Sequence, residues 1–210
     1  MGERVRQKKP TTFWDSVIFS DESSFHTHEA MKGRFVWRFP HEKLKPPFVQ
    51  SVKKFGGHKV QVWGCVTSHG VGWACSLPDG IDSQTYLTIL REELQATMKH
   101  YFTDFKGVFF QQDGAGPHRA KVVKNFFERQ KYSVLPWPAH SPDLSPIENI
   151  WADLKKRLEK NHGEIPKNKL WEVVDDEWEK TSPELCKKLF ASMPDRLQAV
   201  IKARGGYTKY

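Results

Sequence analysis

The first third of the chain alternates apolar and polar side chains with the two-residue period of β-strands. A short apolar run at residues 17–19 ends at Ser20-Asp21-Glu22, and residues 34–38 alternate strictly. Residues 59–67 alternate again, and a His-Gly turn leads into a further apolar stretch at 71–77. We therefore expect strands in this region, the last two of them paired as an antiparallel hairpin.

The apolar spacing changes to that of an amphipathic helix after Asp82-Ser83, a candidate helix cap. The stripe of this helix comprises Leu87, Leu90, Leu94 and Met98. A continuous apolar run at 107–110 then ends at Gln112-Asp113 and is typical of a strand in the centre of a sheet. A second helix is expected around residues 119–130, and a further short strand at 133–137.

A proline-rich segment, residues 138–146, excludes regular structure just before the next helix. Ser145 has the place of the N-cap, Pro146 that of the first helical position, and Glu148 that of the third, the arrangement of a capping box. The expected buried face comprises Ile147, Ile150, Trp151, Leu154 and Leu158. Glu148 falls on a different face of this helix.

The chain from Ile165 onward has the pattern of a helical tail. The spacing of apolar residues predicts one helix through Trp178, a second that opens at Ser182-Pro183, and a third that stops at Gly205-Gly206. Helices that connect the later strands imply parallel crossovers and place helices against the sheet. The pattern as a whole predicts an α/β fold: a mixed sheet flanked by helices, with a helical C-terminal tail.

Composition and charge indicate a basic soluble protein, for which nucleic acid is the first candidate partner and an anionic membrane surface the second; a basic protein without such a partner explains the charge equally well. The 210 residues suit one domain, and a hydrophobic fraction of 38% provides for a buried core. Lys and Arg number 33 against 25 Asp and Glu, and this net charge of +8 favours polyanionic partners. Three separated cysteines argue against a disulfide scaffold or a cysteine zinc site. No apolar run approaches the ~18 residues of a membrane span, so a cytosolic or nuclear protein without membrane contact is expected.

Three acidic residues lie where these expected elements begin or end. Asp21 follows the first strand, Asp113 follows the apolar strand, and Glu148 lies in the first turn of a helix. If the strands at 17–19 and 108–110 are adjacent and parallel, Asp21 and Asp113 emerge side by side at the edge where ligands collect. Two carboxylates at such a short distance repel one another unless a cation lies between them. Oxygen ligands without nearby thiols favour Mg²⁺ or Mn²⁺.

Each acid also has an ordinary structural interpretation, and for any one of them alone that interpretation is the commoner. Asp21 would cap a turn with Ser23, Asp113 would start a glycine-rich turn, and Glu148 would complete the capping box. The metal hypothesis therefore depends on the combination of the three.

Three stretches of sequence surround these acids: residues 19–23 read FSDES, residues 110–113 read FQQD, and residues 137–149 read WPAHSPDLSPIEN. Together they resemble the Tc/mariner superfamily of DNA transposases. The 34 residues between Asp113 and Glu148 match the spacing of that family's second aspartate and final glutamate. Further matches at 35–38, 62–65 and 203–210 extend the resemblance from about Phe13 to Tyr210.

The resemblance implies a ribonuclease-H-like catalytic domain at residues 13–210, preceded by a basic linker or tail at residues 1–12. It implies that Asp21, Asp113 and Glu148 are the catalytic residues and hold two Mg²⁺ or Mn²⁺ ions, about 4 Å apart, on either side of the scissile phosphate. Asp143 is the nearest rival for the third acid, but its spacing and its place in the proline-rich segment indicate a turn residue. The implied activity is phosphodiester hydrolysis and strand transfer in cut-and-paste transposition.

The implied partners are transposon ends and target DNA cut at a TA dinucleotide, with a homodimer left open, and the implied location is the nucleus. The family normally carries two helix-turn-helix modules ahead of this domain, and nothing before Phe13 is long enough to form them. We therefore expect a catalytic-domain fragment or a truncated copy. The basic cluster at residues 4–9 is interpreted as a linker remnant, a nuclear signal or a solvated tail.

Some positions depart from the family pattern. Gly114 stands where members often have Asn. Gly116 stands where members commonly have Pro, and Pro117 follows it, while His118 is retained. The glycine run before the strand at 59–67 is short. Two alternatives stay open: a nuclease with the same fold, and a host-adopted DNA-binding or scaffold protein that does not cleave.

Two further signals are weak. His26 and His28 have the spacing of a metal pair but lack the other ligands of a zinc site, so surface histidines are the preferred interpretation. Lys155-Lys156-Arg157 would contact DNA phosphates or form an exposed helix face.

Overall fold

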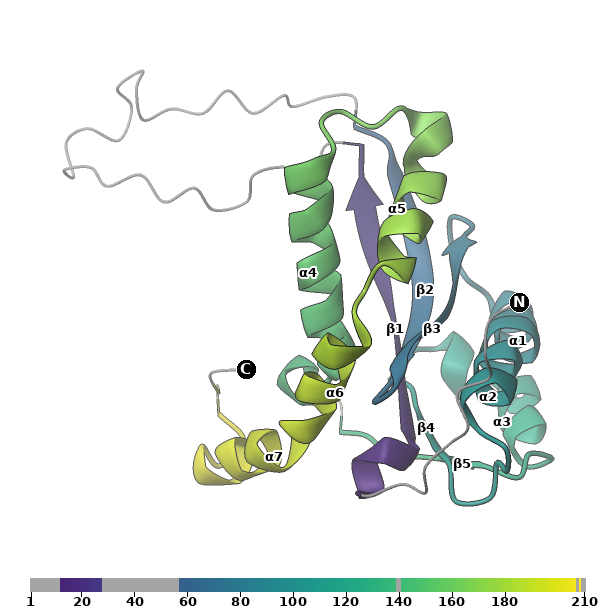
Figure 1. Ribbon diagram of the computed structural model, residues 1–210. Coiled ribbons are helices and arrows are strands. Elements are labelled where there is room, and N and C mark those ends of the chain that lie inside the picture. Colours follow the sequence, from purple (N-terminus) through teal and green to yellow (C-terminus); the bar gives the residue numbers. More distant parts are fainter. Residues whose placement is uncertain (1–11, 28–56, 139–140, 207, 209–210) are drawn as a thin grey trace.

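A five-stranded sheet lies between two groups of helices in the computed structural model, which describes residues 12–27, 57–138, 141–206 and 208 (Figure 1). The strand order is β3-β2-β1-β4-β5. The strands are β1 (Val17–His26), β2 (Lys59–Thr67), β3 (Gly70–Leu77), β4 (Phe109–Gln111) and β5 (Ser133–Val134). The predicted strand at residues 34–38 lies outside the described residues, as does His28.

The sheet is mixed, as predicted. β2 and β3 form the expected antiparallel hairpin, and β2 also pairs antiparallel with β1 from Phe19↔Val66 to His26↔Lys59. β1 pairs with β4 in parallel from Val17↔Phe109 to Phe19↔Gln111, and β4 continues in parallel to β5. The parallel neighbours are those joined through helices, which is the connection that parallel strands require.

The helices form two layers (Figure 1). One layer holds α1 (Ser83–Ile89), a π-helical turn (Leu90–Leu94), α2 (Gln95–Tyr101) and α3 (Lys121–Phe127). The other holds α4 (Pro146–Asn161), α5 (Leu170–Glu179) and α6 (Pro183–Ala191), and α7 (Met193–Lys202) follows at the N-terminal end of α4. Asp82 caps α1 as predicted, since its Oδ1 accepts a hydrogen bond from the Thr85 amide at 2.8 Å.

The two faces of β1 supply the two cores. Val17, Phe19 and Phe25 pack with α4, α5 and α6, whereas Ile18 packs with α1, α2 and α3. On the first face, Gly64 in β2 leaves room for two tryptophans, because a Cβ there would lie 2.8 Å from the Trp151 ring. Successive side chains of a strand point to opposite faces, so Asp21 shares the α4 face with Phe19.

Two strands differ in length from the prediction. β1 does not end before Asp21 but continues to His26, because β2 remains hydrogen-bonded to it after β4 has ended at Gln111. β5 is shorter than the predicted 133–137, and Trp137 instead packs against the core beside Phe19.

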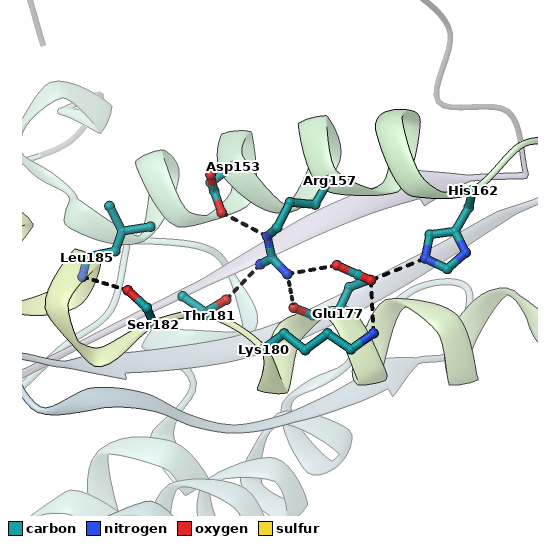
Figure 2. A network of polar contacts seen from close by, with 8 residues as sticks. All are labelled: Asp153, Arg157, His162, Glu177, Lys180, Thr181, Ser182 and Leu185. Atoms are coloured by element: carbon teal, nitrogen blue, oxygen red, sulfur yellow. Dashed lines mark hydrogen bonds and ion pairs between the residues drawn. The ribbon is translucent and has the colours of Figure 1, made fainter.

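A buried carboxylate, Glu177, ties α4 to α5 (Figure 2). Arg157 on α4 donates to Glu177 Oε2 at 2.9 Å, and His162 and Lys180 contact Glu177 Oε1 at 3.2 and 3.0 Å. Burial alone would raise the pKa of Glu177, but the hydrogen bonds from these three cationic or imidazole side chains lower it to about 2.

This network bears on the basic triplet of α4. Arg157 is directed into the protein, and Lys155 donates to Ser23 Oγ at 2.9 Å and lies 5.3 Å from the centre of the Phe25 ring. Lys156 alone of the three is exposed. Phosphate contact by the whole triplet is therefore not supported, and neither is a uniformly exposed face.

Two further features concern the cysteines and the helices. Cys65, Cys75 and Cys186 are free thiols. Among the described residues, no helix has both the length and the apolar character needed to cross a membrane.

Candidate active site

An open cavity of about 410 Å³ lies where the β1–β4 ladder ends, and all three predicted acids line it. Its walls come from β1, β4, the loops after β4 and β5, and the start of α4. The lining residues are Ser20, Asp21, Gln111, Asp113, Gly114, Ala115, Trp137, Pro138, Ser141, Pro142, Ser145 and Glu148. Asp21, Asp113 and Glu148 are the charged side chains among them, so this wall is strongly anionic.

The parallel register explains why the two aspartates meet. Phe19 pairs with Gln111, so Asp21 and Asp113 each lie two residues beyond the last pair of the ladder. Asp21 faces α4 because it shares the face of Phe19, and Glu148 lies in the first turn of α4 on its exposed side. The expectation that Asp21 and Asp113 emerge side by side from adjacent parallel strands is therefore confirmed.

The electrostatics of Asp21 fit a site for a cation. Burial, followed by the negative charge of Glu148, raises the pKa of Asp21 to about 7, and Glu22 and Asp113 add smaller repulsions. Gln111 Oε1 adds a further oxygen to this wall, since the side chain is 3% exposed and Oε1 has no hydrogen-bond partner among the described residues. Carboxylate and amide oxygens are the ligands that Mg²⁺ and Mn²⁺ prefer.

Asp113 is held by its own turn and by a buried histidine. Its Oδ1 accepts a hydrogen bond from the Ala115 amide at 2.9 Å, so the glycine-rich turn considered as an alternative role is present. The same oxygen lies 2.6 Å from His118 Nδ1, and His118 Nε2 lies 3.4 Å from Glu22 Oε1. Burial opposes the charged form of His118, but the nearby carboxylates of Glu22 and Asp113 raise its pKa overall.

His118 and Glu22 were not identified as functional residues from the sequence. Glu22 lies on the opposite face of β1 from Asp21, and the Tyr86 ring stacks on the His118 ring with 3.9 Å between centroids. Tyr86 Oη in turn donates to Gln112 Oε1 at 2.7 Å. The only sequence signal was the retention of His118 five residues after Asp113.

The three acids line one cavity but do not converge on a point in this structure. Within the part of the chain that is described, no three His, Cys, Asp or Glu side chains are close enough together to hold a metal ion. Asp113 is 58% exposed and is drawn toward His118, and Glu148 is exposed at the cavity rim. The oxygen donors present fit divalent ions chemically, and their side chains would have to move for them to share one.

Ser145 does not cap α4 through its side chain, contrary to the predicted capping box. Pro146 occupies the first position of the helix as expected, but the Ser145 side chain accepts no capping hydrogen bond. Asp143 is a turn residue as predicted: it lies in a one-turn 3-10 helix (Pro142–Leu144) and is not part of the cavity lining.

Residues 16–180 match the family model of the DDE superfamily endonucleases. The chain is 34% identical to the Tc3 transposase of Caenorhabditis elegans over 95% of its own length and 59% of that protein. It is 33% identical to the Tc1 transposase of the same organism, over 94% of its own length and 71% of that protein.

Solved structures show the same fold at low sequence identity. The mariner Mos1 paired end complex with Mg matches with a TM-score of 0.78 and 20% identity, over 94% of this chain and 58% of that one. The catalytic domain of Mos1 matches with a TM-score of 0.70 and 16% identity, over 95% of this chain and 87% of that one. The predicted ribonuclease-H-like architecture is thereby confirmed. The chain belongs to the DDE superfamily of endonucleases and, within it, to the group of Tc1-like transposases.

Proposed function

We propose that this chain cleaves and joins DNA strands as the catalytic part of a cut-and-paste transposase. The observation that carries the proposal is the cavity at the end of the β1–β4 ladder, where Asp21, Asp113 and Glu148 are the charged lining residues. Because the chain spans 59% of the Tc3 transposase, the activity of a whole transposase is part of the proposal and not of the family assignment.

Asp21, Asp113 and Glu148 would hold two divalent ions, Mg²⁺ or Mn²⁺. Such ions, when bound, activate the attacking oxygen and stabilise the leaving one. Solved Mos1 complexes contain Mg and Mn, which supports divalent metal use by this family. Burial first, and the negative charge of Glu148 second, raise the pKa of Asp21 to about 7, so a bound cation would stabilise the ionised form of this carboxylate.

The reaction needs no covalent bond between protein and DNA. In hydrolysis a water oxygen attacks the phosphorus in line, the bond to the 3′-oxygen breaks, and the products carry a 5′-phosphate and a 3′-hydroxyl. In strand transfer that 3′-hydroxyl attacks a phosphodiester of the target and releases a new 3′-hydroxyl there. The role of the protein is to hold the ions and the two DNA ends in one geometry.

Transposon ends and target DNA are the proposed partners, with a TA dinucleotide as the target site and the nucleus as the location. A Mos1 structure described as a paired-end complex with the left transposon end supports DNA ends as the ligand, and the net charge of +8 favours a polyanion. Two chains per complex would match a paired-end assembly, and sedimentation of the chain with DNA would test this.

The test is a cleavage and joining assay on the whole chain. Supercoiled plasmid would report nicking with Mn²⁺ or Mg²⁺, and a labelled duplex with a free 3′-hydroxyl would report joining to the plasmid. We expect both activities, and neither with Asp113→Asn. Nicking without joining would identify a nuclease of the same fold, whereas binding without either would identify a non-cleaving DNA-binding protein.

A further inference from the structure

The helix α7 reaches the start of α4 from a part of the chain outside the 16–180 family match. Arg196 on α7 is 2% exposed, although it lies in an amphipathic helix where arginine is ordinarily solvated. Its Nη1 donates to the Asp143 carbonyl oxygen at 2.9 Å and its Nη2 donates to Asn149 Oδ1 at 2.6 Å. One guanidinium therefore joins the loop before α4 to the first turn of α4.

This contact is next to the third acid of the cavity. Asn149 directly follows Glu148, and Asp143 lies in the 3-10 turn that leads into Pro146. Because the Ser145 side chain makes no capping bond, it does not fix the direction of this first turn. A guanidinium is a rigid planar fork, so two donors of one group fix both the distance and the orientation of what they bind.

Other bonds hold Arg196 and the loop in turn. Ser192 Oγ accepts from Arg196 Nε at 3.0 Å, and Thr208 Oγ1 donates to Asp143 Oδ2 at 3.1 Å. The C-terminal segment thus binds the proline-rich loop at the carbonyl and at the carboxylate of one residue, Asp143. A side chain that is 2% exposed does not reach DNA, so this arginine acts within the protein.

We propose that Arg196 is a positioning residue for Glu148: through Asn149 and the Asp143 carbonyl it sets where the first turn of α4 faces Asp21 across the cavity. The proposal rests on the proposed metal-dependent function. It assigns to the C-terminal helix a part in metal binding that the three acids alone do not reveal.

The experiment measures metal binding by the whole chain without relying on catalysis. Melting temperatures of wild type, Arg196→Met, Arg196→Lys, Asn149→Ala and the Arg196→Met/Asn149→Ala double variant would be recorded against Mn²⁺ concentration. A ligand that binds the folded state raises the melting temperature, and the concentration dependence of that rise reports affinity even when the metal-free values differ. Lys202→Ala, an exposed position on α7, removes one positive charge without touching the loop and serves as the matched control.

We expect Arg196→Met to raise about tenfold the Mn²⁺ concentration needed for a given rise in melting temperature, the lower end for residues that orient metal ligands. Arg196→Lys, which keeps the charge but not the fork, should fall between wild type and Arg196→Met. Asn149→Ala should weaken Mn²⁺ binding in the same direction. The double variant should bind Mn²⁺ no more weakly than the more impaired single variant, because Arg196→Met already breaks the contact that Asn149→Ala removes. Lys202→Ala should match wild type.

Two results separate the possible failures. A lower melting temperature for Arg196→Met with a wild-type Mn²⁺ dependence, or additive effects of Arg196→Met and Asn149→Ala, would make Arg196 a merely structural residue. No Mn²⁺ response in wild type would overturn the proposed function itself. If Arg196→Met does not fold, Arg196→Lys and Asn149→Ala decide the question in the same assay.

Discussion

Asp113 Oδ1 lies 2.6 Å from Nδ1 of the buried His118, and this contact orients one of the three acids before any ion is bound. The imidazole bridges two carboxylates, since its Nε2 lies 3.4 Å from Glu22 Oε1 on the other face of β1. The stacked ring of Tyr86 fixes the plane of that imidazole. Three side chains thus hold Asp113 in place without lining the cavity themselves: Glu22, Tyr86 and His118.

His118→Phe tests this support. Phenylalanine keeps a ring against Tyr86 but removes both nitrogen contacts, so the fold should persist while metal-dependent DNA cleavage falls by about 10–100-fold. Nicking rates at several Mn²⁺ concentrations would measure the loss. Tyr86→Phe is the matched control: it removes the hydroxyl bond to Gln112 and keeps the stack, and it should retain most of the activity. Full activity of His118→Phe would show that Asp113 needs no such support.

Ser145→Ala tests the start of α4. The Ser145 side chain makes no capping bond, so its replacement should lower the free energy of unfolding by clearly less than the ~1 kcal/mol typical of a lost N-cap. Ser182 offers the comparison, because its Oγ accepts from the Leu185 amide at 3.1 Å at the start of α6. Ser182→Ala should cost about 1 kcal/mol. Urea denaturation of both variants would decide, and equal losses would restore the capping role of Ser145.

Glu177 gives the protein an acid-sensitive link between α4 and α5. Its pKa is lowered from 4.5 to about 2 by Lys180, His162 and Arg157, against the effect of burial. Ionised Glu177 therefore stabilises the folded state above pH 4.5, and that contribution is lost as the pH falls toward 2. Glu177→Gln should lower stability at pH 6 and flatten the decline between pH 4.5 and 2, as followed by denaturant titration.

Glu172→Gln is the control for this effect. Glu172 pairs with Lys169 at 2.7 Å, but the two side chains are 60% and 55% exposed, so solvent screens the pair and its loss should scarcely change stability. If the stability of Glu177→Gln declined between pH 4.5 and 2 as steeply as that of wild type, Glu177 would be excluded as the cause of the decline.

Local patterns were sufficient to predict much of the fold. The β2–β3 hairpin and the buried face of α4 appear at the predicted residues, because strict alternation and a continuous apolar stripe each allow one orientation toward a core. The gathering of Asp21 and Asp113 was also predictable, since it needs only two adjacent parallel strands.

The remaining features depend on partners far away in the sequence. The extension of β1 to His26 is imposed by β2, and β2 begins at Lys59. The capping-box signature at Ser145 specifies residue types but not the side-chain rotamer that a bond requires. Arg196 has no signature at all, because its acceptors lie 47 and 53 residues earlier in the chain and a single arginine in an amphipathic helix ordinarily indicates a solvated face.

The metal site itself is tested by neutralising each acid in turn. Asp21→Asn, Asp113→Asn and Glu148→Gln each remove one negative charge from the cavity wall, where burial and then the charge of Glu148 raise the pKa of Asp21 to about 7. The metal-free variants should therefore be as stable as wild type or slightly more stable. Glu148 is exposed in the first turn of α4, so its replacement spares the helix.

Wild type should melt at a higher temperature as Mn²⁺ is added, and the variants should gain much less, because each has lost a ligand. Cleavage should disappear in all three, while DNA binding that depends on phosphate contacts should persist and weaken steeply with salt. Glu159→Gln is the control, since Glu159 is exposed on α4 and lies outside the cavity lining, and it should keep the Mn²⁺ response. Equal Mn²⁺-induced shifts in wild type and in the three variants would show that the ions bind elsewhere.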